Sequence, residues 1–310
     1  MILGYRLLRC LPPSAVSTIG ARLHPWLFAH PSPDKRQERL IAFSKRVYPR
    51  LTVAERTAWA EGHLRAMGRV RAEIALPARY LDSADLQVEG MAHVDAARST
   101  GRPLIIPFVH LGNWKITVAA LMARGVPGVQ IALPEADPRS ARIVTDFRRR
   151  FGIETLAPGY RGAAGALRAL RAGQALFLAI DELHRARVNA PRLGRTGVGA
   201  DGNLSIAARL SLATKALIVP AFTLRRHGVR LVLHVLAPID PQTLCPADPP
   251  KSTPTEDDLV RAIVAHLDGL ITPIVLAHLD QWAGLAPLID DREMRRATGP
   301  LADIEPGGWP

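Results

Sequence analysis

The feature of this sequence that most constrains its fold is the alternation of short apolar runs with helical segments after residue 80. The apolar runs have the length and composition of buried strands. The predicted strands cover residues 86–88, 104–109, 129–133, 153–156, 175–180, 216–223 and 229–236. Strands that alternate with helices favour an α/β fold with a largely parallel central sheet, flanked by helices on both faces.

The first 80 residues have a different, helical pattern. Thr52 with Glu55 three positions later predicts a capping box, and Pro77 is expected to end the helix that it opens. Residues 1–30 form a short basic and apolar segment, which suits either a helix on a membrane surface or an ordinary packed helix. We expect a membrane-associating helical arm over 1–80, an α/β domain over 81–290 and a C-terminal tail over 291–310.

Charge and composition narrow the classes of function. The chain has 40 Lys and Arg against 28 Asp and Glu, a formal net charge of +12. A basic chain suits nucleic acid, an anionic membrane surface or an acidic protein as partner, although an arginine-rich genome produces the same excess. Aromatic residues make up 5% and do not interleave with the basic runs, so nucleic acid is the poorest of these partners.

The cysteines and the apolar stretches argue against two kinds of structure. Cys10 and Cys245 are too few and too far apart in sequence for a disulfide framework or a cysteine zinc site. We expect no membrane-spanning helix, because charges or prolines interrupt the apolar stretches before they reach the required length of about 18 residues.

The residues most suited to chemistry follow two predicted strands. His110 comes directly after the strand at 104–109, and Asp181 follows the strand at 175–180. Carboxyl ends of parallel strands share one sheet edge, which is where such folds bind ligands. Gly112 and Asn113 suit a tight turn into the next helix, whose first N–H groups can bind an anion. A histidine there can take a proton from a hydroxyl, although a structural histidine is the alternative.

The segment from His110 to Trp114 resembles the catalytic block of the bacterial lipid A biosynthesis acyltransferases, the lauroyl and myristoyl transferases of the lysophospholipid acyltransferase superfamily. Further stretches agree with that family in the same order along residues 35–285. They are Tyr48-Pro49, Glu55-Arg56, Gly68, Glu73, Glu89-Gly90, 148–152, Ile180-Asp181, Gly194-Arg195, 203–220 and Gln281-Trp282. The resemblance implies a glycerolphosphate-acyltransferase-like fold and a peripheral location on the cytoplasmic face of the inner membrane.

The resemblance also implies a reaction. His110 would deprotonate a hydroxyl of a lipid A precursor, another glycolipid or a phospholipid. That oxygen would attack an acyl thioester on acyl carrier protein or coenzyme A, with no cofactor, metal or covalent acyl-enzyme. N–H groups near Gly112 and Asn113, or an arginine, would stabilise the oxyanion. We expect Arg192, Gly194 and Arg195, in a glycine-rich loop, to contact substrate.

The departure from the family pattern is Lys115, which stands where the resemblance places a carboxylate, five positions after His110. A charged lysine cannot accept an imidazole N–H, and its charge opposes formation of an imidazolium. Either another acid takes over, with Asp181, Glu182 and Glu135 as candidates, or the chain is a catalytically impaired relative that binds lipid or acyl carrier protein. Lys115 itself is interpreted as a substrate-phosphate ligand or as a solvated side chain.

Overall fold

The computed structural model describes residues 8, 10–27, 33–74, 76–81, 83–135, 138–181, 183–184, 187–193, 202–244 and 254–290. The predicted C-terminal tail at 291–310 therefore lies outside the described residues.

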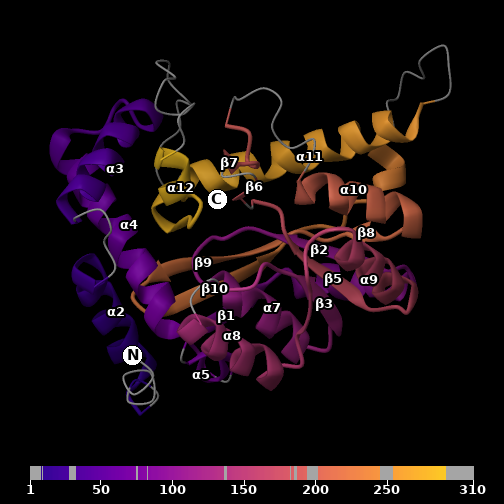
Figure 1. Ribbon diagram of the computed structural model, residues 1–310, viewed down its shortest axis with the longest axis horizontal. Coiled ribbons are helices and arrows are strands. Elements are labelled where there is room, and N and C mark those ends of the chain that lie inside the picture. The colour runs from indigo at the N-terminus through magenta and orange to yellow at the C-terminus, as the bar shows by residue number, and fades with distance from the viewer. Residues whose placement is uncertain are drawn as a thin grey trace.

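An eight-stranded sheet forms the centre of the molecule (Figure 1). Its strand order is β1-β10-β9-β2-β5-β3-β4, with β8 also beside β2, and only the β9–β10 pair is antiparallel. The strands are β1 Leu86–Glu89, β2 Leu104–Phe108, β3 Gly128–Ile131, β4 Glu154–Leu156, β5 Ala175–Ala179, β8 Leu217–Ile218, β9 Ala221–His227 and β10 Arg230–Val235. Two short strands, β6 Leu183–His184 and β7 Arg187–Val188, pair separately. The predicted α/β fold with a largely parallel sheet is confirmed.

One predicted strand is wrong in detail. The apolar run at 216–223 forms two strands, because Pro220 has no N–H to donate and interrupts the ladder beside β2. β8 and the first residue of β9 both pair with β2, and β9 then continues to His227 and turns back into β10.

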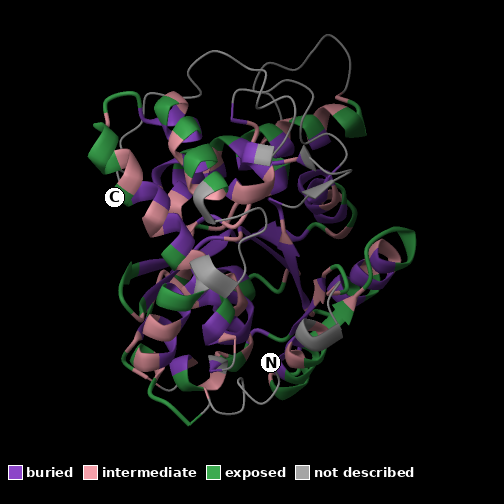
Figure 2. Ribbon diagram, turned by 60° about the vertical axis from the view of Figure 1, so that its left-hand side comes forward, coloured by how far each residue is buried: buried purple, intermediate pink, exposed green. Residues whose placement is uncertain are grey.

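Helices cover both faces of the sheet (Figure 1). One hydrophobic cluster packs beneath α9 Tyr160–Arg171, α10 Asn203–Thr214, α11 Glu256–Ala277 and α12 Leu285–Asp290. The other packs beneath α5 Pro77–Leu81, α6 Met91–Ser99, α7 Trp114–Ala123 and α8 Pro138–Arg150. Figure 2 shows the strands as buried ribbons between helices whose outer faces are exposed.

The predicted arm region contains α2 Pro13–Leu27, α3 Pro33–Val47 and α4 Val53–Glu73, which are called the arm below. The predicted capping box at Thr52 is confirmed, although α4 ends at Glu73 and Pro77 opens the next helix, α5. Trp59 near the start of α4 belongs to one hydrophobic cluster, and Ala72 near its end belongs to the other. α4 therefore crosses from one face of the sheet to the other, beside β9 and β10 in Figure 1.

The final helix, α11, corrects the expectation that no segment could span a membrane. By length and composition its 22 residues could do so, but half of its most apolar window is buried inside the fold. Ile263, Leu267 and Val275 are among its residues with essentially no exposure. α11 therefore packs as a core helix of the α/β domain.

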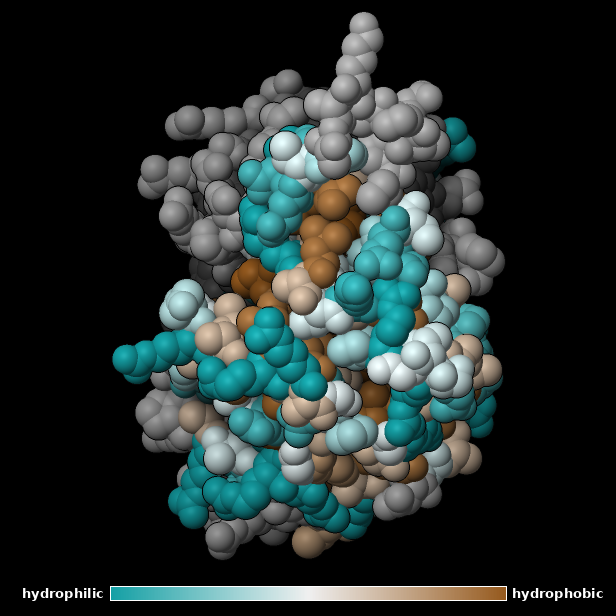
Figure 3. Space-filling view, turned by 90° about the vertical axis from the view of Figure 1, so that its right-hand side faces the viewer, coloured by the Kyte–Doolittle hydropathy of each residue, from teal (hydrophilic) through white to brown (hydrophobic). Residues whose placement is uncertain are grey.

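The face opposite the arm carries a strip of hydrophobic surface bordered by hydrophilic side chains (Figure 3). Elements on this side, β4, α9 and α10, carry apolar side chains that stay partly exposed: Leu156, Leu167, Ile206 and Leu212. Apolar surface that is contiguous marks a place where lipid or another apolar ligand can bind.

Candidate functional site

His110 lies in a turn between the end of β2 and Asn113, the N-cap of α7. Residues 281–283 bind the backbone of this turn. The carbonyl of His110 accepts a hydrogen bond from the Ala283 N–H at 2.9 Å, and the Gly112 N–H donates to the Gln281 carbonyl at 3.2 Å. Leu111 forms an isolated antiparallel bridge with Trp282. The turn is thus fixed to a segment about 170 residues later in the chain.

Asp181, at the end of β5, forms a two-point contact with His110. Its Oδ1 lies 2.7 Å from His110 Nδ1, and its Oδ2 accepts the His110 backbone N–H at 2.6 Å. The same Oδ2 accepts the Trp282 indole N–H at 2.7 Å. The Asp181 side chain is fully buried, whereas that of His110 is 28% exposed. β2 and β5 are sheet neighbours, which is why these two strand ends meet.

This arrangement assigns the tautomer of the imidazole. An ionised Asp181 can only accept, so Nδ1 carries the proton and Nε2 has a free lone pair. A buried carboxylate behind a partly exposed histidine is the geometry of a general base whose orientation is fixed. Among the three candidate acids, the structure brings Asp181 to His110, pairs Glu135 with Lys115 and does not describe Glu182.

Lys115 lies in the first turn of α7, near the site. Its Nζ is 3.7 Å from Glu135 Oε1 and 5.7 Å from the centre of the Trp114 ring. Trp114 in turn packs edge-on against His110, with 5.1 Å between ring centres. Burial lowers the pKa of Lys115; Glu135 opposes this, and the charge of Arg148 adds to it. Around Lys115, two cations, Lys115 and Arg148, therefore share one carboxylate, Glu135.

Gly112 and Asn113 have structural reasons for their places. Gly112 has φ +51°, and a Cβ there would lie 2.4 Å from the Thr223 carbonyl oxygen on β9. Asn113 is buried, and its amide nitrogen donates to Glu73 at 3.0 Å instead of capping its own helix. Both residues belong to the turn, and their contact with substrate stays a prediction.

Replacement of Gly112 by alanine is expected to lower the free energy of unfolding by about 2–4 kcal/mol, because a strained φ adds to a backbone clash. Gly125→Ala is the matched control. Gly125 has φ +79°, but a Cβ there meets nothing within 4 Å, so a loss of only about 1 kcal/mol is expected. Urea unfolding of both variants measures the difference, and equal losses would show that the contact with β9 is unimportant.

The remaining predicted substrate contacts lie elsewhere or outside the described residues. The Arg192 N–H donates to Asp268 on α11 at 2.9 Å. Gly194 and Arg195 are not described. In the basic run of α8, Arg149 pairs with Asp146 on an exposed face, whereas Arg148 is near enough to Glu135 for their charges to interact. Among the described residues, no cluster of three or more His, Cys, Asp or Glu side chains could hold a metal ion.

Sequence reasoning missed three contributors to the site. Trp282 stood out only as part of a Gln-Trp pair, with no predicted role. Glu73 stood out only as part of the family resemblance in the N-terminal region, with no predicted role, and Arg225, within a strand, gave no local signal. Gln281 exchanges two side-chain hydrogen bonds with the backbone of Arg225, at 2.7 and 3.0 Å, and so ties the segment near residue 282 to β9.

Comparison with known proteins gives one family match. The family model described as bacterial lipid A biosynthesis acyltransferase matches residues 1–282. A search of curated proteins finds no significant match.

Proposed function

The chain belongs to the bacterial lipid A biosynthesis acyltransferase family, and on this premise we propose that it moves a fatty acyl chain from an acyl thioester to a lipid hydroxyl. Family membership makes it an acyltransferase that acts in lipid A biosynthesis. The proposed donor is acyl carrier protein or coenzyme A. The proposed acceptor is a lipid A precursor or a related glycolipid or phospholipid.

The contact between His110 and Asp181 is the observation that carries this proposal. Nε2 of His110 takes the proton of the acceptor hydroxyl, and the oxygen attacks the thioester carbonyl. The buried Asp181 stabilises the imidazolium that forms. When the tetrahedral intermediate collapses, the C–S bond breaks and His110 returns the proton to the sulfur, so the products are an ester and a thiol.

The N-terminus of α7 supports this mechanism as the oxyanion site. In the part of the chain that the structure describes, the N–H groups of Trp114 and Lys115 have no hydrogen-bond acceptor, and no side chain caps the helix. Free N–H groups at a helix N-terminus, together with the helix dipole, favour an anion there. Such fixed donors stabilise the charge that develops on the thioester oxygen.

The excess positive charge around Lys115 supports an acceptor with a negative group close to the reacting hydroxyl. Lys115 and Arg148 are both half-buried or deeper and share one carboxylate, Glu135. A phosphate bound beside them would balance the charge, and lysine binds phosphate as a point charge. We propose that Lys115 acts in this way, with Arg192, Gly194 and Arg195 contacting other parts of the substrates.

Transfer of a labelled acyl chain tests the function, and Lys115→Glu separates it from the alternative of an impaired relative. Purified protein is incubated with acyl thioester and a lipid A precursor, and the product is identified by mass spectrometry. We expect transfer by the wild type and a decrease of at least about 10-fold in Lys115→Glu, because a second carboxylate would face Glu135 and repel a phosphate.

Lys115→Met is the matched control, because it removes the positive charge without adding a negative one, and an intermediate rate is expected. An inactive wild type combined with an active Lys115→Glu variant would instead identify the chain as an impaired relative. Such a relative would bind lipid or acyl carrier protein without transferring.

Lipid A acyltransferases are in general membrane-associated, and we propose a peripheral position on the cytoplasmic face of the inner membrane. Exposed Leu11 and Leu23 of the arm support membrane contact there. The net charge of +12 supports attraction to anionic headgroups.

A further inference from the structure

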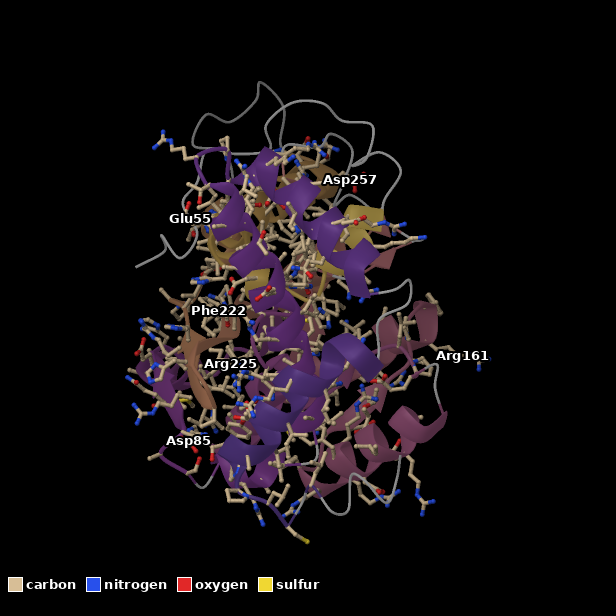
Figure 4. All side chains as sticks on the ribbon, turned by 90° about the vertical axis from the view of Figure 1, so that its left-hand side faces the viewer. Glu55, Asp85, Arg161, Phe222, Arg225 and Asp257 are labelled. Atoms are coloured by element: carbon tan, nitrogen blue, oxygen red, sulfur yellow. The ribbon has the colours of Figure 1, made fainter. Side chains whose placement is uncertain are left out.

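A buried polar cluster joins the arm to the turn that carries His110. Its centre is Glu73, at the end of α4, whose side chain is fully buried. Oε2 of Glu73 accepts hydrogen bonds from Asn113 Nδ2 at 3.0 Å and from Arg225 Nη2 at 2.6 Å. Oε1 accepts from the Ser17 hydroxyl at 2.6 Å. Figure 4 looks onto the arm and shows Arg225 on β9, beside the lower part of α4.

A buried carboxylate needs such partners, because removing a charge from water is costly unless the charge is paired and hydrogen-bonded. Arg225 provides the opposite charge, and its own side chain is only 7% exposed. That pair alone neutralises Glu73. The hydrogen bond from Asn113 is therefore not required to balance the charge of Glu73. Its main consequence is to fix the orientation of the Asn113 side chain.

Asn113 occupies the position where an asparagine ordinarily caps its helix by accepting from the N–H groups of the first turn. Here the side chain turns to Glu73 and makes no capping bond. Its Oδ1 is buried and has no hydrogen-bond partner within the described residues. The contact with Glu73 therefore leaves the N–H groups of Trp114 and Lys115 open.

We propose that Glu73 is a positioning residue: through the amide of Asn113 it keeps the N-terminus of α7 uncapped and fixes the turn that bears His110. The inference rests on the proposed acyl transfer, for which those N–H groups receive the oxyanion. Glu73 belongs to α4, so the arm would also help to position the reacting groups, in addition to any contact with a membrane.

A double-mutant cycle of Glu73→Gln and Asn113→Ala tests this, since coupled residues give non-additive effects. Glutamine keeps the shape of Glu73 but removes its negative charge, so the hydrogen bond from Asn113 loses its charge-assisted strength and Arg225 loses its ionic partner. We expect each single variant to lower kcat about 10- to 100-fold with KM for the acyl donor within about twofold, because the lost stabilisation belongs to the transition state. The double variant should be no slower than the slower single variant. Multiplying effects, or an unchanged kcat in Glu73→Gln, would overturn the proposal.

Ser17→Ala is the matched control, because it removes the donor to Oε1 of the same carboxylate, whereas Asn113 and Arg225 donate to Oε2. We expect its melting temperature to fall while kcat stays within about twofold of the wild type. A role of Glu73 in folding alone predicts the same pattern for all three single variants, lower melting temperature with unchanged kcat. That result would contradict a positioning role.

A spectroscopic measurement keeps this test separate from the proposed function. If the wild type transfers no acyl chain, the proton on His110 Nδ1, hydrogen-bonded to Asp181, still gives a downfield NMR resonance in protein with labelled histidine. We expect this resonance to shift or broaden in Glu73→Gln and in Asn113→Ala, and to remain in place in Ser17→Ala. If Glu73→Gln does not fold, Asn113→Ala decides: an unchanged resonance and an unchanged kcat would overturn the proposal.

Discussion

Replacement of His110 by alanine is expected to lower the single-turnover rate of acyl transfer by at least about 10³-fold. A positioned general base contributes roughly 10²- to 10⁴-fold, and the alanine variant also loses the acid that protonates the leaving sulfur. The described structure holds no second base beside the helix N-terminus, since Asp181 is buried behind the ring and Glu135 pairs with Lys115. The measurement is the rate of ester formation at saturating acyl thioester, followed by mass spectrometry.

His227→Ala is the control, because His227 lies at the exposed end of β9 and its loss should leave the rate unchanged. Circular dichroism and the melting temperature must show that His110→Ala folds. Asp181 keeps two of its donors in that variant, the residue-110 backbone N–H and the Trp282 indole. A folded His110→Ala variant within about 10-fold of the wild-type rate would exclude His110 as the base.

The positions of His110 and Asp181 could be predicted because each follows an apolar run that reads as a buried strand. Parallel strands bring such residues to one edge of the sheet. The choice of Asp181 over Glu135 could not be predicted, because it depends on strand order. β5 lies between β2 and β3, so the end of β5 is the immediate neighbour of His110. Nothing in the local sequence encodes that order.

The contacts that Trp282 and Arg225 make around the site could not be predicted from the sequence for a related reason. Trp282 is separated from Asp181 by 101 positions, and Arg225 from Glu73 by 152. A single glutamate in a helix is ordinarily interpreted as a solvated side chain. Here α4 passes from one face of the sheet to the other and buries Glu73 among hydrogen-bond donors. Only the tertiary packing of the arm reveals this.

The length of α11 shows a different limit of prediction from the sequence, which concerns where a helix ends. Pro273 lies inside α11, where a proline removes a backbone hydrogen bond and ordinarily ends or kinks a helix. The helix nevertheless continues to Ala277. Pro273 faces solvent, whereas Ile271, Ile274 and Val275 are buried in the core. Their packing outweighs the lost hydrogen bond, so tertiary contacts override the local preference.

Replacement of Asp181 by asparagine is expected to lower kcat by about 10³- to 10⁴-fold, with little change in KM, because it reverses the tautomer of His110. Oδ2 of Asp181 accepts two N–H donors, from the His110 backbone and from Trp282. The single oxygen of an asparagine amide should take that position, which turns the NH₂ group toward Nδ1 of the ring. An NH₂ group there needs an acceptor, so Nδ1 loses its proton and Nε2 carries it. That tautomer cannot remove a proton from the acceptor, and the neutral amide no longer stabilises an imidazolium.

Trp282→Phe provides the matched comparison, because it removes one donor from Oδ2 and leaves the carboxylate in place. Asp181 still accepts from the ring and from the backbone, so a decrease of about 10-fold or less is expected. Glu135→Gln tests the other candidate acid that the structure describes. Glu135 contacts Lys115, and its loss should change KM for a phosphorylated acceptor more than kcat. If Glu135→Gln loses activity while Asp181→Asn keeps it, the carboxylate that serves His110 during turnover is Glu135, and the ion pair with Lys115 must open before the reaction.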